Sequence, residues 1–247
     1  MHQPHLSVYG ENLQFRYANQ YSKGELKVVW LGLIYIDGHR AQQESVEQFV
    51  ERFKKEGLLN AIKQLKGSFY LVLVTSLGKY SFVDNSGMYA AYRSNSNSSS
   101  SYLHLIKQHE KRWSDVDPIA LTEFMQLGNI YFQRTHFADI SKISFDEICF
   151  TDNSGSMSIL EKSALSIFHS PEPYASLDES FRHYAYAIGN IPTSIDATGG
   201  LDTRTVLAAM VANNLDFETS VSGYHGHPDV LIGKEVASSI KKTFFRN

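Results

Sequence analysis

The pattern of apolar and polar positions divides the chain into two regions. Up to about residue 165, short apolar runs alternate with polar turns, which predicts buried antiparallel strands. The strongest runs are 28–36, 67–74 and 80–84. Apolar residues at helical spacing predict helices over 42–56 and 117–128, the second opening at Asp117-Pro118. From about residue 172 strand and helix patterns alternate, which predicts a parallel sheet.

These patterns predict the fold class. Residues 1–165 are expected to form an α+β domain of antiparallel sheets with helices, and residues 172–247 the start of a doubly wound α/β domain. Residues 1–25 show no clear period. The run 94–101 reads SNSNSSSS, which is typical of a flexible polar loop between strands. We therefore expect that run to be mobile and dispensable for stability.

Composition narrows the classes of function. A net charge of −3 and a pI of about 6.4 argue against nucleic acid or an acidic membrane surface as the partner. No apolar run approaches the roughly 20 residues of a membrane span, and the first residues lack a signal-peptide pattern. The single cysteine, Cys149, excludes an internal disulfide framework. Together these features predict a cytoplasmic protein.

The stretch 191–212 carries the most specific chemical signal. A short run with Thr193 and Ile195 leads into TGGLDTR at 198–204, and a helical pattern follows. We call residues 198–203 the glycine turn. A strand, a tight turn and a helix start direct free backbone N–H groups at one point, which suits a phosphate. Gly199 and Gly200 allow close approach of the anion. The other groups expected to contact a phosphate are the hydroxyls of Thr198 and Thr203. The carboxylate of Asp202 is expected to contact it through Mg²⁺.

Alternatives to a phosphate site remain open at this point. The glycine pair is also compatible with an ordinary turn between a strand and a helix. The string is not a Walker loop, because no Gly-Lys-Ser/Thr ends it, and it lacks the third glycine of the dinucleotide fingerprint. Leu201 is expected to pack the turn, and Arg204 to face either phosphate or solvent.

The glycine turn resembles the pyrophosphate loop of the PP-loop ATP pyrophosphatases, Ser-Gly-Gly-x-Asp-Ser, with threonine in place of both serines. Taken with other stretches, the chain resembles the asparagine synthetase family, which joins a class II glutamine amidotransferase domain (Ntn glutaminase-like) to a PP-loop synthetase domain. The other matching stretches are 31–37 (LGLIYID), 65–69 (LKGSF), 84–87 (DNSG) with Tyr92, 117–128 with Ile140, and 226–229 (GHPD) with 234–237 (KEVA).

Departures from the family pattern alter the expected activity. The family's glutaminase uses a cysteine at the second position, where this chain has His2. The family's Asn-Gly, which helps to form the oxyanion hole, is Leu31-Gly32 here, so an amide donor is lost. Cys149 lies far away in a late strand. Residues 1–165 are therefore expected to be a degenerate amidotransferase-like domain without glutaminase activity.

The resemblance implies an ATP-dependent amide-forming ligase of amino-acid biosynthesis. Such an enzyme adenylates a small-molecule carboxylate, releases pyrophosphate and admits an amine. It would bind ATP and Mg²⁺ through Thr198, Gly199, Gly200, Asp202 and Thr203, with Ser222 near the adenine. The synthetase-type domain is expected to be truncated, covering only its N-terminal part in 172–247. The alternative is a degenerate, non-catalytic protein that binds nucleotide or packs against a partner, and a homodimer is also left open.

Several conspicuous residues are not expected to form sites. His225 and His227 have the spacing of metal ligands, but no third ligand is suggested nearby, which favours a loop role. His2 and His5 are expected at a disordered chain end. Asp37 and Asp84 are expected to be turn residues.

Overall fold

A computed structural model describes residues 3–110, 112–162, 176–189 and 191–246. The chain forms two compact units. The first comprises Met1–Tyr35 and Gln42–Ser170, and the second comprises Ile36–Ala41 and Pro171–Asn247. Each unit has its own sheets and helices.

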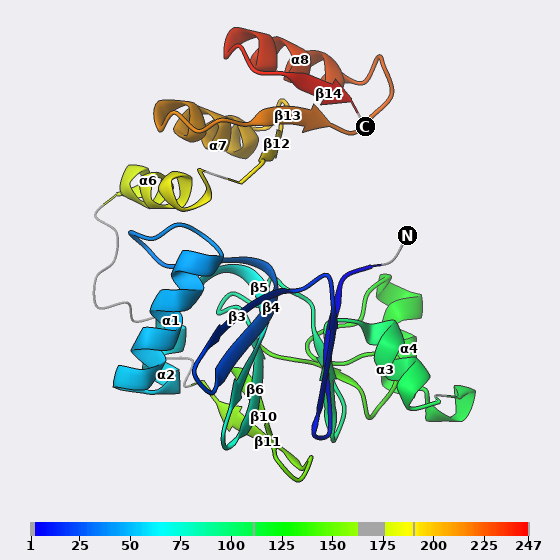
Figure 1. Ribbon diagram of the computed structural model, residues 1–247. Helices are drawn as coiled ribbons and strands as arrows, with labels where there is room; N and C mark the ends of the chain where they lie inside the picture. The colour runs from blue at the N-terminus through cyan, green and yellow to red at the C-terminus, as the bar shows by residue number, and fades with distance from the viewer. Residues whose placement is uncertain (1–2, 111, 163–175, 190, 247) are drawn as a thin grey trace. The chain divides into compact units, whose positions relative to one another are not determined.

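The first unit contains two antiparallel sheets (Figure 1). One has the strand order β11-β10-β6-β5-β4-β3 and the other β2-β1-β8-β7-β9. The strands are β1 His5–Tyr9, β2 Asn12–Arg16, β3 Asn19–Lys23, β4 Leu26–Tyr35, β5 Lys66–Thr75, β6 Gly78–Val83, β7 Tyr92–Arg93, β8 Asn97–Ser99, β9 Ser141–Lys142, β10 Glu147–Asp152 and β11 Met157–Glu161. The helices are α1 Gln43–Glu56, α2 Leu58–Lys63, α3 Tyr102–Gln108, the 3-10 turn η1 Trp113–Asp115 and α4 Pro118–Leu127.

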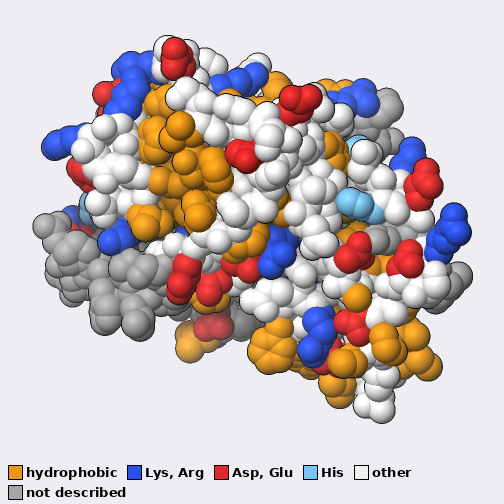
Figure 2. Space-filling model, turned by 90° about the horizontal axis from the view of Figure 1, so that it is seen from below, with side chains coloured by type: hydrophobic (Ala, Val, Ile, Leu, Met, Phe, Trp, Pro, Cys, Tyr) orange, Lys and Arg blue, Asp and Glu red, His pale blue; other side chains and the backbone are white. Residues whose placement is uncertain are grey.

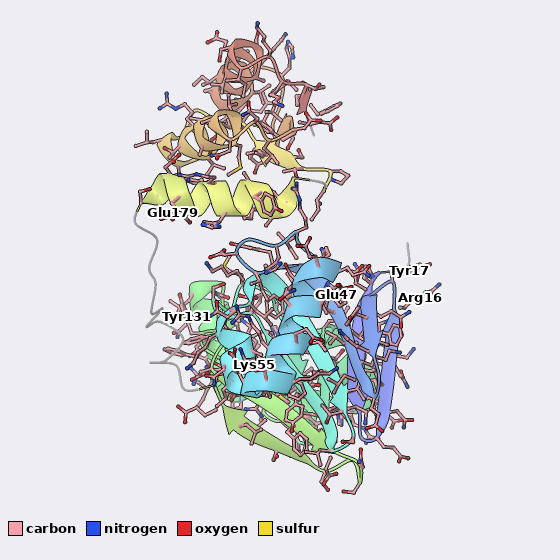
Figure 3. The ribbon with its side chains drawn as sticks, turned by 60° about the vertical axis from the view of Figure 1, so that its left-hand side comes forward. Arg16, Tyr17, Glu47, Lys55, Tyr131 and Glu179 are labelled. Atoms are coloured by element: carbon pink, nitrogen blue, oxygen red, sulfur yellow. The ribbon has the colours of Figure 1, made fainter. Side chains whose placement is uncertain are left out.

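Helices cover the outer faces of the two sheets, so the unit has a helix–sheet–sheet–helix order (Figure 1). The core between the sheets joins β1, β4, β5 and β10, with Val8, Val29 and Val72 among its buried residues. On one outer face, Phe49 of α1 lies 6.5 Å from Phe82 of β6, measured between ring centroids. Glu47 and Lys55 lie on the outer side of α1 (Figure 3). The α+β pattern of antiparallel sheets with helices is therefore confirmed for this unit.

The strongest sequence patterns correspond to the observed elements. The apolar runs 28–36, 67–74 and 80–84 form β4, β5 and β6, because each supplies a continuous buried segment. The helix expected at 117–128 is α4, where the side chain of Asp117 accepts hydrogen bonds from the N–H groups of Ile119 and Ala120. Gly128 ends α4 with a φ of 70°.

The prediction for the serine-rich run 94–101 is wrong. Part of this run forms β8, the middle strand of the five-stranded sheet, and Ser98 and Ser99 are fully buried. Tyr70 Oη of β5 donates to Ser98 Oγ across the two sheets over 2.9 Å, and within the five-stranded sheet Ser7 Oγ of β1 and Ser99 Oγ lie 2.7 Å apart. The buried hydroxyls of Ser98 and Ser99 thus both have partners in the core. The run is therefore part of the core.

The expected turn residue Asp84 follows β6, but its side chain is 1% exposed. Its two carboxylate oxygens accept hydrogen bonds from the backbone N–H groups of Phe69, Ser86, Met88 and Tyr89 and from the Ser86 hydroxyl. Lys162, which no sequence motif marks, is also 1% exposed, and its Nζ donates to the carbonyl of Val83 over 2.6 Å. The first unit therefore contains a buried carboxylate with several donors and, at the same strand end, a buried amine.

The buried amine of Lys162 predicts a pH-dependent stability. Burial lowers its pKa from the ordinary 10.5 to about 7, although Asp84 and Asp146 act in the opposite direction. At pH values between these two pKa values the unfolded chain binds a proton that the folded chain does not bind, so the free energy of unfolding rises with pH. Below pH 7 both states are protonated and the folded state carries the full cost of burying the charge. The rise should be about 2 kcal/mol between about pH 7 and 9.

Urea unfolding at these two pH values measures this effect, and Lys162→Met should lack the rise. Lys55→Met, which removes an exposed lysine of α1, should keep it. The same pH slope in wild type and Lys162→Met would contradict the assignment to Lys162.

The second unit is a three-stranded parallel sheet with helices. Its strands are β12 Ser194–Asp196, β13 Glu218–Val221 and β14 Phe244–Arg246, in the order β12-β13-β14. Its helices are α6 Leu177–Ile188, α7 Leu201–Ala212 and α8 Pro228–Ser239. The alternating strand and helix pattern and its parallel sheet are confirmed. The Ser176 side chain caps α6 by accepting from the N–H of Glu179.

No described helix combines the length and the apolar character that crossing a membrane requires. On the face shown in Figure 2, Lys and Arg side chains are interspersed with Asp and Glu side chains.

Candidate functional site

The glycine turn joins β12 to α7 at the carboxyl edge of the parallel sheet. β12 ends at Asp196, Ala197 is fully buried, and α7 begins at Leu201 with Gly200 as its N-cap residue. Gly200 has no side chain to cap α7, so the first N–H groups of this helix have no side-chain cap. This is the backbone arrangement that an anion can complete.

Two hydroxyls lie beside Gly200. Thr198 Oγ1 accepts from the N–H of Gly200 over 3.3 Å and donates to Thr203 Oγ1 over 3.1 Å. A Cβ added at Gly200 would lie 3.4 Å from Thr198 Oγ1 and 4.0 Å from Thr203 Oγ1, with no other contact within 4 Å beyond its chain neighbours. The space over Gly200 is therefore open and lined by hydroxyl groups.

The opposite side of the turn is formed by the start of α8. The N–H of Gly199 donates to Asp229 Oδ1 over 3.3 Å. A Cβ at Gly199 would lie 3.0 Å from Ile232 Cδ1. Asp229 was not among the residues expected at the site. Its sequence signals are the Pro228-Asp229 pair, which is typical of a helix start after the second strand, and its place in the stretch GHPD at 226–229.

The remaining predicted residues lie within the turn or next to it. Asp202, in the first turn of α7, and Ser222, directly after β13, are both exposed. Because β12 and β13 are parallel, Ser222 lies at the same sheet edge as the turn. Arg204 Nε donates to the carbonyl of Gly200 over 3.4 Å. Leu201 is 72% exposed, so the expectation that it packs the turn is wrong.

Of the two histidines at 225 and 227, His227 has a local structural role. His227 is the N-cap of α8, and its Nδ1 accepts from the N–H of Asp229 over 3.2 Å. Among the residues that the structure describes, no group of three or more His, Cys, Asp or Glu side chains could hold a metal ion. A Mg²⁺ ion bound here would rely on one or two carboxylates and on substrate phosphates, as this ion commonly does.

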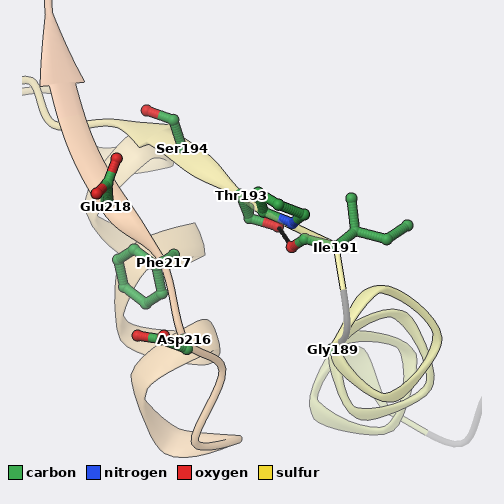
Figure 4. A pocket seen from close by; sticks show the side chains of 8 residues that line it. Gly189, Ile191, Thr193, Ser194, Asp216, Phe217 and Glu218 are labelled. Carbon is green, nitrogen blue, oxygen red and sulfur yellow. Dashed lines mark hydrogen bonds between the residues drawn. The ribbon is translucent and has the colours of Figure 1, made fainter.

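A cavity lies at the other end of the strands. It has a volume of about 520 Å³ and is lined by residues of the amino ends of β12 and β13, including Ser194, Phe217 and Glu218 (Figure 4). Thr193 Oγ1 donates to the carbonyl of Ile191 beside it. A neighbouring cavity of about 410 Å³ is lined by α6 and by the loop after α7. Both are at the edge opposite the glycine turn, where no sequence pattern predicts a site.

The first unit offers no thiol nucleophile among its described residues. Cys149 is fully buried in β10, and burial raises its pKa to about 12, so the thiol stays protonated and inert. Leu31 is 5% exposed and belongs to the core between the sheets. His2 lies outside the described residues.

The expectation that His5 lies at a disordered end is wrong. It begins β1, and its ring stacks on His104 of α3 at a centroid distance of 5.0 Å. Burial and the neighbouring His104 lower its pKa.

No protein-family model matches the chain, and no curated protein matches it. Among solved structures, it is similar to the glutamine phosphoribosylpyrophosphate amidotransferase of B. subtilis complexed with ADP and GMP, with 10% identity and a TM-score of 0.33 over 90% of this chain and 60% of that chain. A structure of the allosteric regulatory enzyme of purine biosynthesis gives 10% identity and a TM-score of 0.34 over 92% and 53% of the two chains.

The chain thus spans little more than half the length of these two proteins. At TM-scores of 0.33 and 0.34 these similarities define neither the fold nor the activity of this chain.

Proposed function

We propose that the second unit binds the pyrophosphate part of ATP at the glycine turn. The observation that supports this most is the open space over Gly200, which is lined by Thr198 Oγ1 and Thr203 Oγ1 at the uncapped start of α7. Backbone N–H groups and hydroxyls are donors, which is what phosphate oxygens require. The position at the carboxyl ends of parallel strands is also the usual place for ligands in such sheets.

Each of the predicted site residues has a role in this proposal. Gly199 and Gly200 present backbone N–H groups, and Thr198 and Thr203 add hydroxyl donors. Asp202 would hold Mg²⁺, which supplies positive charge against the phosphates. Ser222, at the end of the neighbouring strand, would lie near the adenine through its backbone.

The reaction class that fits such a site is that of an asparagine synthetase-like carbon–nitrogen ligase. A small-molecule carboxylate would be adenylated by ATP with release of pyrophosphate, and an amine would then attack to form an amide. The buried, protonated thiol of Cys149 supports an amine source other than glutamine hydrolysis by the first unit. The contribution of the glycine turn would be to bind and orient the leaving pyrophosphate.

A second candidate is a non-catalytic nucleotide-binding or partner-packing role. It is favoured by the two described cavities of the second unit, which lie at the sheet edge away from the glycine turn. In this role the protein would bind a nucleotide or a partner without catalysing a reaction.

Substitution of Asp202 tests the proposed cation role. Asp202→Asn removes charge but keeps an oxygen, so the affinity for pyrophosphate measured by calorimetry should lose most of its Mg²⁺ dependence, a change of about tenfold. Thr203→Ser keeps the hydroxyl and should leave the affinity nearly unchanged. If Asp202→Asn retained the full Mg²⁺ dependence, Asp202 would not be the metal ligand.

A further inference from the structure

One backbone donor of the glycine turn is already paired with an acidic side chain. The N–H of Gly199 donates to Asp229 Oδ1 over 3.3 Å, and Asp229 lies 30 residues further along the chain. A carboxylate oxygen that accepts from a backbone N–H of such a turn resembles a phosphate oxygen in its charge and in the hydrogen bond that it accepts. The turn thus holds an anion that the chain itself supplies.

Close packing of α8 keeps Asp229 in this position. A Cβ at Gly233 would lie 2.0 Å from the carbonyl oxygen of Ala197, so only glycine allows α8 to approach the end of β12 so closely. Ile232 lies against Gly199 in the same turn of α8. The backbone N–H of Asp229 also donates to His227 Nδ1 over 3.2 Å. The contact between Asp229 and Gly199 therefore follows from the packing of a whole helix.

We propose that Asp229 is an internal competitor for phosphate at the glycine turn. This inference rests on the proposed function, since it concerns which anion occupies the N–H of Gly199. A phosphate oxygen must displace the carboxylate from that donor, and the two negative charges repel each other at short range. Metal-free pyrophosphate therefore binds poorly, and a divalent cation relieves the repulsion. Asp229 in this way makes phosphate binding depend on the metal.

The alternative is that Asp229 only tethers α8 to the turn. Asp229→Asn distinguishes the two roles, because the amide oxygen still accepts from Gly199 while the charge is gone. The matched control is Glu235→Gln, which removes the same charge from an exposed position of the same helix.

The experiment is calorimetric titration of the full chain with pyrophosphate, with EDTA and with excess Mg²⁺, for wild type and both variants. We expect Asp229→Asn to bind metal-free pyrophosphate at least about tenfold more tightly than wild type, and Glu235→Gln to match wild type. Excess Mg²⁺ should reduce the difference in pyrophosphate affinity between Asp229→Asn and wild type. Melting curves establish that the variants are folded, and Asp229→Ser serves as a second charge-removing variant.

The outcomes separate this inference from the proposed function. If wild type binds magnesium pyrophosphate and Asp229→Asn gains nothing without metal, the competitor role is wrong while the binding site stands. If neither wild type nor any variant binds under either condition, the proposed function fails, and the competitor role fails with it.

Discussion

Deletion of residues 95–100 is expected to abolish cooperative folding of the first unit. The deletion removes β8, which pairs with β1 on one side and with β7 on the other, so the five-stranded sheet is cut in its middle. It also removes the hydroxyls of Ser98 and Ser99, which pair with those of Ser7, Tyr70 and Ser81 in the core. Thermal unfolding followed by circular dichroism should show no transition for this unit. A melting temperature close to that of wild type would contradict the buried position of β8.

A point substitution gives the same test on a smaller scale. Ser98→Ala removes the acceptor of Tyr70 Oη and the partner of Ser81 Oγ, and should lower the free energy of unfolding by about 1–3 kcal/mol. Asn95→Ala, at an exposed position of the same run, is the matched control and should change it by less than about 0.5 kcal/mol. Equal effects of the two variants would indicate that the hydroxyl pairs contribute nothing specific.

Gly200→Val is expected to remove ATP and pyrophosphate binding, with a loss of affinity of about 100-fold or more. The new side chain would fill the space beside Thr198 Oγ1 and Thr203 Oγ1. The backbone at Gly200 has a φ of −67° and a ψ of 149°, which valine adopts readily, so the fold should be retained. Calorimetry measures the affinity, and Ala208→Val, on the exposed side of α7, is the control for added bulk. If Gly200→Val bound ATP with unchanged affinity, the turn would have a structural role only.

The sequence predicts those parts of the fold whose signal is local. The runs that form β4, β5 and β6 are long and apolar, and α4 has both of its caps in the sequence. β2 and β3 have no such signal, because they are polar and largely exposed. β8 is not predicted for a different reason. Its serines belong to the core because of their contacts with Tyr70, Ser81 and Ser7, which lie far away in the chain.

At the candidate site, too, the sequence predicts the features with a local signal and not those that depend on tertiary contacts. The string TGGLDTR is sufficient to predict a strand, a turn and a helix start, and the structure contains all three. It does not predict Asp229, because that contact depends on the packing of Gly233 of α8 against Ala197. It also does not predict the exposure of Leu201, since the partner that would cover an apolar residue cannot be read from a local pattern. Tertiary contacts decide both.

Backbone amide NMR of the full chain, titrated with magnesium pyrophosphate, tests the central claim most directly, because it locates the ligand. If the glycine turn is the phosphate site, the largest shift changes should fall on the amides of Gly199, Gly200 and the first turn of α7, and saturate with concentration. Changes confined to the cavity around Ser194, Phe217 and Glu218, or no saturable changes at all, would contradict the account.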